Sequence, residues 1–270
     1  MSASDRWRIP PRTKVDLGDF EPDSTDGAPG GKEETRAATT VLLERVAGLQ
    51  ARLWAEHTRS LLVVLQAMDA GGKDGTVKKV FSGVNPMGVH AVAFKAPNDT
   101  ELAHDFLWRV QRELPERGDI GIFNRSHYED VLIVRVEELV PEKVWRPRYS
   151  AIRAFEEHLA GEGTAIVKLF LHISKEEQAE RFKERLSDPT KNWKFNVADV
   201  DVRKRWDDYQ LAYAEAIGRT STDAAPWYVV PADRKWYRDW AVATILVDVL
   251  EKMDPLFPEP APGLSQVKIV

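Results

Sequence analysis

The chain has no cysteine among its 270 residues. This absence excludes disulfide bonds, thiolate metal sites and a cysteine nucleophile. It is in keeping with a reducing compartment, so we expect a cytoplasmic protein. No apolar run approaches the roughly 20 residues that a membrane-spanning helix needs. The polar N-terminal stretch also lacks the apolar core of a signal peptide, and we expect no membrane partner.

An excess of positive charge is missing too. Lysine and arginine total 38 against 43 aspartate and glutamate residues, which leaves a formal net charge of −5. General affinity for nucleic acid is therefore not expected, and a polyanion would have to bind at a local basic patch. Apolar residues make up 43% of the chain and charged residues 30%, as in ordinary globular proteins. The length suits one large α/β domain.

The order of apolar runs predicts the organisation of the chain. We expect five buried strands, at residues 61–66, 89–94, 120–124, 165–172 and 227–231. Helices are expected at residues 33–56, at 100–114 with Thr100 as its cap, at 175–186 with Ser174 as its cap, and at 235–253. Alternating strands and helices indicate a parallel sheet covered on both faces.

The ends of the chain are expected to lie outside this domain. Residues 1–31 are predicted to form an extended or disordered arm, whose RWRIP start could pack on the domain or on a neighbouring subunit. Residues 32–254 form the single domain, with a lid at about 181–209. Residues 255–270 are rich in proline and form a C-terminal tail.

The most informative stretch is LLVVLQAMDAGGKDG, residues 61–75. Its layout predicts a strand, a phosphate-binding loop and a helix N-terminus, close to the pattern G-x-x-x-x-G-K-[ST]. Lys73 can reach phosphate oxygens there, whereas a lysine without a ligand would be disfavoured by the helix dipole. Ala67 and Asp74 depart from the pattern. Asp69 is interpreted as a metal ligand, because a carboxylate otherwise repels phosphate; a turn-capping role is the alternative.

A second motif, FNRSHYED, follows the third expected strand at residues 123–130. The strand beside a phosphate loop usually ends in an aspartate that serves Mg²⁺. Here that residue is Asn124, a neutral ligand or a hydrogen-bond donor. Arg125 is expected to point its guanidinium at the site; the alternative is a surface salt bridge with Glu129. His127 is interpreted as a packed residue rather than a catalyst.

A basic cluster at residues 181–195 is the third signal. Arg181 and Arg185 share one helix face by their spacing, and Pro189 ends that helix. A basic hairpin with Trp193 and Phe195 as anchors predicts a mobile lid over phosphates. The alternative is a solvated basic face balanced by nearby acids.

These three segments together resemble the family-2 polyphosphate kinases, which move phosphate between inorganic polyphosphate and nucleotides. The loop at residues 67–75 and the motif at 123–130 resemble the two phosphate motifs of that family. Residues 188–195 and 206–209 resemble its lid, and residues 225–233 its last strand. The resemblance covers about residues 33–250. It implies a P-loop kinase-like fold close to thymidylate kinase, with a parallel sheet, flanking helices and a helical lid.

The resemblance also implies roles for individual residues. Asp69, Lys73 and Arg125 are the expected catalytic residues. Mg²⁺ is the expected metal, with Mn²⁺ as an alternative; Asp69 would hold it, with Asn124, Glu129 or Asp130 as a second ligand. The residues expected to bind phosphate or polyphosphate are Ala70, Gly71, Gly72, Asp74, Gly75, Lys78, Lys79, Arg181, Arg185 and Lys194.

The variant of the second motif resembles the subgroup that phosphorylates both AMP and ADP. The expected substrates are polyphosphate with AMP and ADP, and GMP and GDP as further candidates, in a homodimer or homotetramer. Two alternatives remain at this level: an ATP-dependent nucleotide kinase of the same fold, and a non-catalytic sensor of phosphate or nucleotide.

Overall fold

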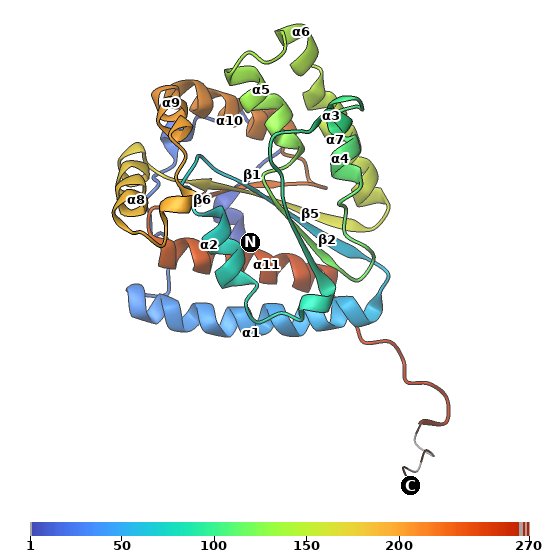
Figure 1. Cartoon of the computed structure of the whole chain (residues 1–270). Coiled ribbons are helices and arrows are strands. Elements are labelled where there is room, and N and C mark those ends of the chain that lie inside the picture. Colours follow the sequence, from blue (N-terminus) through green and yellow to red (C-terminus); the bar gives the residue numbers. More distant parts are fainter. Residues whose placement is uncertain (1, 265–266, 268, 270) are drawn as a thin grey trace.

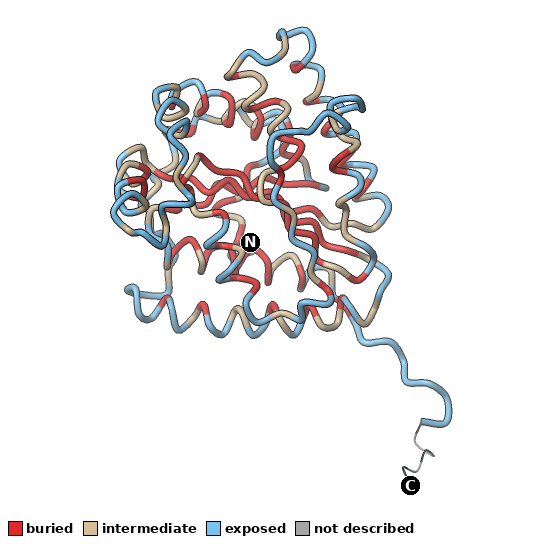
Figure 2. Tube along the Cα trace, viewed as in Figure 1, coloured by how far each residue is buried: buried red, intermediate tan, exposed pale blue. Residues whose placement is uncertain are grey.

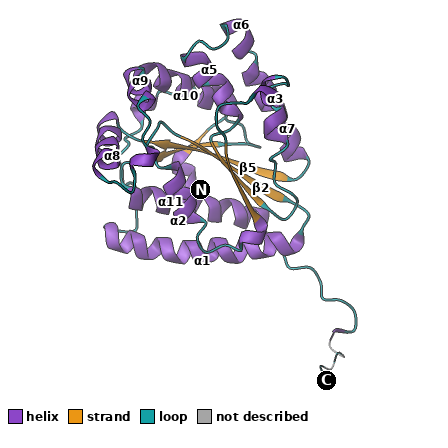
Figure 3. Ribbon diagram, in the orientation of Figure 1, coloured by secondary structure: helices purple, strands orange, loops and turns teal. Residues whose placement is uncertain are grey.

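The protein is a three-layer structure with a twisted sheet between two layers of helices (Figure 1, Figure 3). It is described here from a computed structural model that covers residues 2–264, 267 and 269. Helices α1, α2 and α11 cover one face of the sheet, and α5, α7 and α10 cover the other. Among the described residues, no helix is long and apolar enough to cross a membrane.

The sheet has six strands, in the order β1-β6-β5-β2-β4-β3. Their bounds are β1 Arg8–Ile9, β2 Ser60–Gln66, β3 Val89–Ala93, β4 Ile120–Asn124, β5 Thr164–His172 and β6 Trp227–Pro231. The five strands expected from the sequence all occur and run parallel. The expected strand count is wrong, however, because β1 adds an antiparallel edge strand beside β6 and makes the sheet mixed.

Helices connect the successive parallel strands, because two parallel strands cannot be joined by a tight turn. The α-helices are α1 Lys32–Glu56, α2 Lys73–Val80, α3 Asp99–Leu102, α4 Trp108–Gln111, α5 Ile133–Val136, α6 Glu142–Trp145, α7 Arg148–Gly161, α8 Lys175–Ser187, α9 Ala198–Lys204, α10 Trp206–Thr220 and α11 Lys235–Met253. The 3₁₀ helices are η1 Ala3–Trp7, η2 Leu17–Asp19, η3 Pro86–Gly88, η4 His127–Val131 and η5 Asn192–Lys194.

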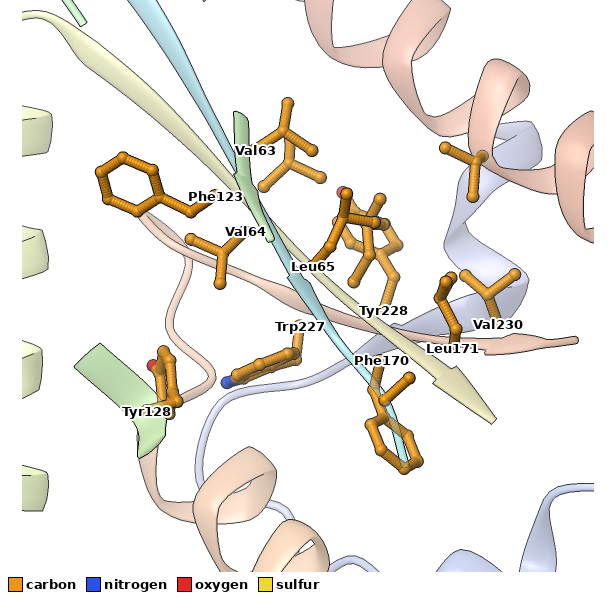
Figure 4. Packing of buried hydrophobic residues seen from close by; sticks show 14 of the residues in the cluster. Val63, Val64, Leu65, Phe123, Tyr128, Phe170, Leu171, Trp227, Tyr228 and Val230 are labelled. Atoms are coloured by element: carbon orange, nitrogen blue, oxygen red, sulfur yellow. The ribbon is translucent and has the colours of Figure 1, made fainter. Parts of the chain in front are cut away.

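The core lies on both faces of the central strands, which Figure 2 shows as the most buried part of the chain. Every residue of β2 and β6 is buried, which explains why these strands are continuous apolar runs rather than alternating ones. Residues paired in register share a face. Figure 4 shows the two sets, with Val63, Leu65, Leu171, Tyr228 and Val230 on one side and Val64, Phe123, Phe170, Trp227 and Tyr128 on the other.

The described part of the N-terminal arm packs on the domain, which is one of the two contacts considered for its RWRIP start. Ile9 pairs with Trp227 in the sheet, and the indole of Trp7 is buried against α11. Its ring meets Tyr237 edge-on at a centroid distance of 6.2 Å. The Tyr237 hydroxyl donates to the carbonyl of Asp26 at 2.6 Å. The arm buries aromatic surface and uses backbone hydrogen bonds that a free tail would leave in water.

The prediction of a single helix over residues 100–114 is wrong. The chain forms two short helices there, and Asn98 rather than Thr100 caps the first through a capping box with Glu101. The Asp105 carboxylate accepts from the backbone N–H of Leu107 at 3.0 Å, and its carbonyl accepts from Trp108. This local turn competes with helix hydrogen bonds and interrupts the apolar spacing of four.

The expected ends of helices α8 and α11 agree closely with the structure. Helix α11 spans the expected residues, and the side chain of Ser174 accepts from Glu177 N at 3.0 Å to cap α8. Helix α8 ends at Ser187, just before Pro189. The described residues of the C-terminal tail are mostly exposed and lead away from the domain (Figure 1).

Truncation of Trp7 to alanine should lower the free energy of unfolding by about 3–5 kcal/mol, because the ring fills a site between Tyr237 and Trp240. Denaturant unfolding followed by far-UV circular dichroism measures the change. Trp193→Ala is the matched control: its side chain is 77% exposed, and the expected change stays within about 0.5 kcal/mol. Equal losses in the two variants would contradict the packing of the arm.

Candidate functional site: a phosphate loop interlocked with a second motif

The phosphate loop joins the end of β2 to the start of α2. Ala70 has a φ of 60° and Gly72 a φ of 98°, both in the left-handed region. Such residues within a turn align successive backbone N–H groups into an anion-binding concavity. Gly71 is needed for a different reason: a Cβ there would lie 2.4 Å from the Cβ of Ala67 and 2.8 Å from the carbonyl oxygen of Met68.

The loop carbonyls are bound by side chains on the protein side. The carbonyl of Ala67 accepts from the Lys73 ammonium at 2.8 Å and from the Tyr213 hydroxyl at 3.1 Å. The carbonyl of Asp69 accepts from the Gln178 amide at 2.9 Å. Because carbonyl oxygens repel phosphate, turning them toward internal donors leaves the opposite side of the loop to N–H groups.

Two buried arginines complete this support. Arg181 donates to the carbonyl of Ala70 at 2.9 Å, and Arg238 lies 3.4 Å from the carbonyl of Gly72. Arg238 also forms an ion pair of 2.6 Å with Asp239. Burial lowers the pKa of Arg238 more than Asp239 raises it.

Among the described residues, three successive backbone N–H groups at the start of α2 are left without a protein acceptor, whereas that of Gly71 donates to the carbonyl of Met68 at 2.9 Å. The three groups are those of Gly72, Lys73 and Asp74, and free N–H groups are the normal state of a helix N-terminus. Together with the helix dipole they form a site for an anion. The expected phosphate-binding backbone, residues 70–75, is therefore brought together as one cradle.

Lys73 is the first residue of α2 and is buried, with 9% of its surface exposed. Burial and the neighbouring Arg125 lower the pKa of its ammonium to about 8, although Asp69 acts in the opposite direction. A phosphate anion at the cradle would restore the pKa by favouring the charged form. The side chain is thus held beside the cradle, and without a ligand its ammonium loses its charge as the pH rises through about 8.

The second motif lies against the loop because β4 is the parallel neighbour of β2. The backbone N–H of Arg125 donates to the carbonyl of Leu65 at 3.0 Å. Its guanidinium donates to the Asp69 carboxylate at 2.9 Å, rather than pairing with Glu129 as in the alternative considered above. Arg125 adopts this position with a φ of 62°, an unfavourable conformation for a residue with a Cβ.

Asp74 of the loop and Asn124 of the second motif, which both differ from the residues usual in P-loop enzymes, are hydrogen-bond partners. The Asn124 amide donates to the Asp74 carboxylate at 2.6 Å. An aspartate in place of Asn124 would bring two carboxylates to this distance, and they would repel each other. The neutral residue on β4 therefore fits the acidic residue on α2.

A small cavity of about 60 Å³ opens between these motifs and α10. Its polar lining is formed by Asp69, Arg125, Glu129, Tyr209 and Tyr213. Burial lowers the pKa of Arg125, but Glu129 and Asp69 outweigh this effect and keep it above its ordinary value. The cavity thus combines a guanidinium, two carboxylates and two phenol rings next to the cradle.

Asp130 does not join this cavity. Its carboxylate accepts from Arg148 at 2.9 Å, on the side of η4 that faces α7. Burial raises the pKa of Asp130, and Arg148 offsets part of that rise. Of the two acidic residues that end the second motif, the structure therefore brings only Glu129 to the loop.

The lid residues have different surroundings from one another. Arg181 is buried, and its guanidinium also donates to the carbonyls of Ala232 and Asp233 at 2.6 and 3.1 Å. It supports the loop from behind, which differs from the expected clamp on phosphates. Trp193 is exposed and is not an anchor, whereas Phe195 packs edge-on against Phe182 at 5.7 Å.

Lys194 and Arg185 stand closer to open solvent. The Lys194 ammonium lies 3.5 Å from the Asp74 carboxylate, so the lid reaches the start of α2. Arg185 lies 3.4 Å from the carbonyl of Lys194 and 4.0 Å from Asp199. Neither cation is enclosed by carbonyl groups as Arg181 is.

Lys78 and Lys79 are exposed on α2, beyond the cradle. Lys78 lines a second cavity of about 260 Å³, together with Asp74, Asn124 and apolar residues of β3. The first cavity is thus lined by Arg125 and the second by Lys78, and each also contains a residue of the loop or of α2, Asp69 or Asp74.

A family model described as polyphosphate kinase 2 matches residues 30–258. The chain belongs to the polyphosphate kinase 2 family. The resemblance noted from the sequence motifs is thereby confirmed.

Two curated relatives and one solved structure cover nearly the whole chain. A protein of Meiothermus ruber, named AMP/ADP-polyphosphate phosphotransferase, is 52% identical and covers 98% of this chain and 99% of its own length. An ADP-polyphosphate phosphotransferase of Rhodopseudomonas palustris is 45% identical, and the match covers 96% of this chain and 93% of that protein. The crystal structure of polyphosphate kinase 2 from Arthrobacter aurescens is 42% identical and matches with a TM-score of 0.94 over 98% of this chain and 95% of that chain.

Sequence reasoning missed three residues that shape the site of this family-2 kinase: Gln178, Tyr213 and Arg238. Each lies far along the chain from the loop and contacts it through a backbone carbonyl. Their residue types are ordinary for helices. Only the wrapping of α8, α10 and α11 under the loop reveals their contact.

Replacement of Gly72 by alanine should lower the free energy of unfolding by about 1–3 kcal/mol, because of its left-handed φ. The new Cβ would also lie 2.2 Å from the Arg238 guanidinium. Denaturant unfolding measures the loss. Gly48→Ala in α1 is the matched control: no atom lies within 4 Å of its Cβ, and a gain of about 0.5–1 kcal/mol is expected. A neutral effect of Gly72→Ala would contradict the geometry of the loop.

Proposed function

We propose that this protein transfers the terminal phosphate of inorganic polyphosphate to AMP and ADP, reversibly, giving ADP and ATP. One observation carries the proposal: Arg125 of the second motif pairs with Asp69 of the loop, beside a cavity lined by two tyrosines. This site occurs in a chain that matches an enzyme named AMP/ADP-polyphosphate phosphotransferase over 98% of its residues. A transferase for two anionic substrates needs two adjoining phosphate sites, and the cavity beside the cradle supports this proposal.

The proposed roles follow from where the cations lie. Lys73, Arg125 and the loop N–H groups would bind the transferring phosphate. Lys78 and Lys79 would guide the polyphosphate chain, and the lid cations Arg185 and Lys194 would close over it. For Arg181 we propose a supporting role in place of a direct contact, because its donors are directed to backbone carbonyls and Glu177.

The site fits a divalent cation, for which we propose Mg²⁺, with Mn²⁺ as an alternative. Asp69 and Glu129 line the same cavity and offer oxygen ligands. No group of three or more candidate metal ligands occurs among the described residues, and Mg²⁺ commonly needs only one or two carboxylates besides substrate phosphates. When bound, the ion would neutralise charge on the phosphates, with Asn124 as a further neutral donor.

Transfer would then depend on positioning and electrostatics. A nucleotide phosphate has a second pKa near 6 and is already ionised at neutral pH, so no strong general base is needed. One of its oxygens forms the new bond to the terminal phosphorus, the bond to the bridging oxygen breaks, and the shortened polyphosphate leaves. Lys73 and Arg125 would stabilise the charge on the transferring group.

We extend the proposal to three finer points. The parallel strand order and the loop between β2 and α2 support a P-loop kinase-like fold, close to thymidylate kinase, with residues 181–209 as a helical lid. GMP and GDP are proposed as further acceptors. A homodimer or homotetramer is the proposed assembly.

The decisive assay incubates the purified protein with Mg²⁺, long-chain polyphosphate and either AMP or ADP. Formation of ADP and ATP is the expected result. Transfer from ATP with indifference to polyphosphate would select an ATP-dependent nucleotide kinase. Binding without any product would select a sensor.

Lys73→Met should lower the rate of this reaction at least about 100-fold, by analogy with the loss of one preorganised oxyanion donor in other enzymes. Lys252→Met is its control, since Lys252 is exposed in the last turn of α11, away from the loop. A similar loss in both variants would show that the assay does not report on this site.

The reaction with limiting polyphosphate should slow as pH rises through about 8. The reason is that burial lowers the pKa of Lys73 to about 8 in the free enzyme, so its charge is lost above that pH. Bound phosphate raises the pKa of Lys73 again. The decline of kcat should therefore begin at a higher pH than the decline of kcat/KM. Rate profiles from about pH 6 to about 10 measure both parameters.

Lys73→Arg supplies the control, because arginine keeps its charge throughout this range. Its kcat/KM should be lower but should lack the decline near pH 8. A decline that persists in Lys73→Arg would assign the titration to another group.

A further inference from the structure

A closed cluster of polar side chains lies in the core behind the second motif, and none of the roles proposed above uses it. The Glu156 carboxylate accepts from Lys168 at 2.6 Å and lies 2.8 Å from the Tyr128 hydroxyl. A ring nitrogen of His127 is 3.2 Å from the same carboxylate. Each of these four residues is at most 1% exposed.

The cluster joins four elements of the fold. Tyr128 belongs to η4, Glu156 to α7 and Lys168 to β5. Lys168 also donates to the carbonyl of Thr220, the last residue of α10, at 2.7 Å. Its three N–H groups thereby have three acceptors: Glu156, Thr220 and the Tyr128 hydroxyl, the last at 3.0 Å. Aromatic packing encloses the cluster, with Trp227 edge-on to Tyr128 at 4.8 Å (Figure 4).

The cluster reaches the site through η4. The Ser126 hydroxyl oxygen caps this helix by accepting from Tyr128 N at 3.2 Å, and it accepts from Gln66 Nε2 at the end of β2 at 3.2 Å. Arg125 precedes the cap, and Glu129 lies on η4 facing the cavity. The segment that carries these two residues is therefore held by β2 on one side and by the buried cluster on the other.

A buried ion pair is a costly way to gain stability. Burial raises the pKa of Glu156, and the charge of Lys168 together with the hydrogen bonds from His127 and Lys168 brings it below its ordinary value. Apolar side chains of similar volume generally stabilise a core as well or better. Unlike apolar packing, the cluster fixes the orientation of side chains. The Tyr128 hydroxyl and the His127 ring must both point toward the carboxylate of Glu156.

We propose that Glu156 and Lys168 are positioning residues for phosphate transfer. Through Tyr128 and His127 they set the orientation of η4, and so the approach of Arg125 and Glu129 to Asp69. Through Thr220 the same pair holds the end of α10, the helix whose tyrosines line the cavity. The effect on turnover rests on the proposed function, whereas the effect on η4 does not.

The test replaces the ion pair by apolar residues in the double variant E156L/K168M. A merely structural pair predicts a folded protein with unchanged kcat. The positioning role predicts a cooperative thermal transition, a kcat lowered about tenfold or more and a smaller change in KM for ADP, since misplacement of catalytic groups lowers turnover. A folded double variant with kcat within twofold of the parent would overturn the proposal.

Tyr128→Phe provides a second variant that keeps the packing and the ion pair. It removes the hydroxyl that links η4 to Glu156, and kcat should fall at least about threefold. Tyr228→Phe is its matched control, because Tyr228 is a buried tyrosine on the opposite face of the sheet. Equal kcat in the two phenylalanine variants would count against the role of Tyr128.

Hydrogen–deuterium exchange of the same proteins gives a readout that does not need turnover. Amides of residues 125–131 should exchange faster in E156L/K168M and in Tyr128→Phe than in the parent, with β2 unchanged. If the parent protein transfers no phosphate, the proposed function fails, but this measurement still tests the link to η4. Unchanged exchange at residues 125–131 in both variants would overturn it.

Discussion

The geometry of the loop between β2 and α2 depends on one constraint: its carbonyl groups must be bound by internal donors if its other side is to hold the proposed phosphate. A peptide turn presents both N–H and C=O groups, and only the former attract phosphate. Here Lys73 and Tyr213 bind the first loop carbonyl, and Gln178, Arg181 and Arg238 approach the later ones. These donors come from α2, α8, α10 and α11, so helices from both sides of the sheet converge beneath the loop.

Two contacts between the loop and the second motif pair the charged side chains of the site. Asp69 and Arg125 form an ion pair, while Asp74 and Asn124 form a hydrogen bond beside it. The residues that look like defects of a P-loop are thus compatible with each other. Parallel pairing of β2 with β4 makes this possible, because the carboxyl ends of neighbouring parallel strands meet at one edge of the sheet.

Much of the fold could be predicted from sequence because its central strands are continuous apolar runs and its main helices have clear ends. Ser174 and Pro189 marked the limits of α8. Failures occurred where a local or long-range contact overrode the pattern. Asp105 interrupts the helix that spacing alone favours, and Trp7 becomes a core residue only because α11 offers it aromatic neighbours.

By itself, the sequence determined that Asp69 and Lys73 lie in the segment after β2 and that Arg125 directly follows β4, because loop and strand signals are local. It also determined the family, through motifs at characteristic spacings. Only the tertiary structure decided that Arg181 faces the loop from behind, that Asp130 pairs with Arg148, and that Glu129 enters the cavity. The reason is that the direction of a side chain depends on packing between elements, and residues adjacent in the chain can face opposite ways.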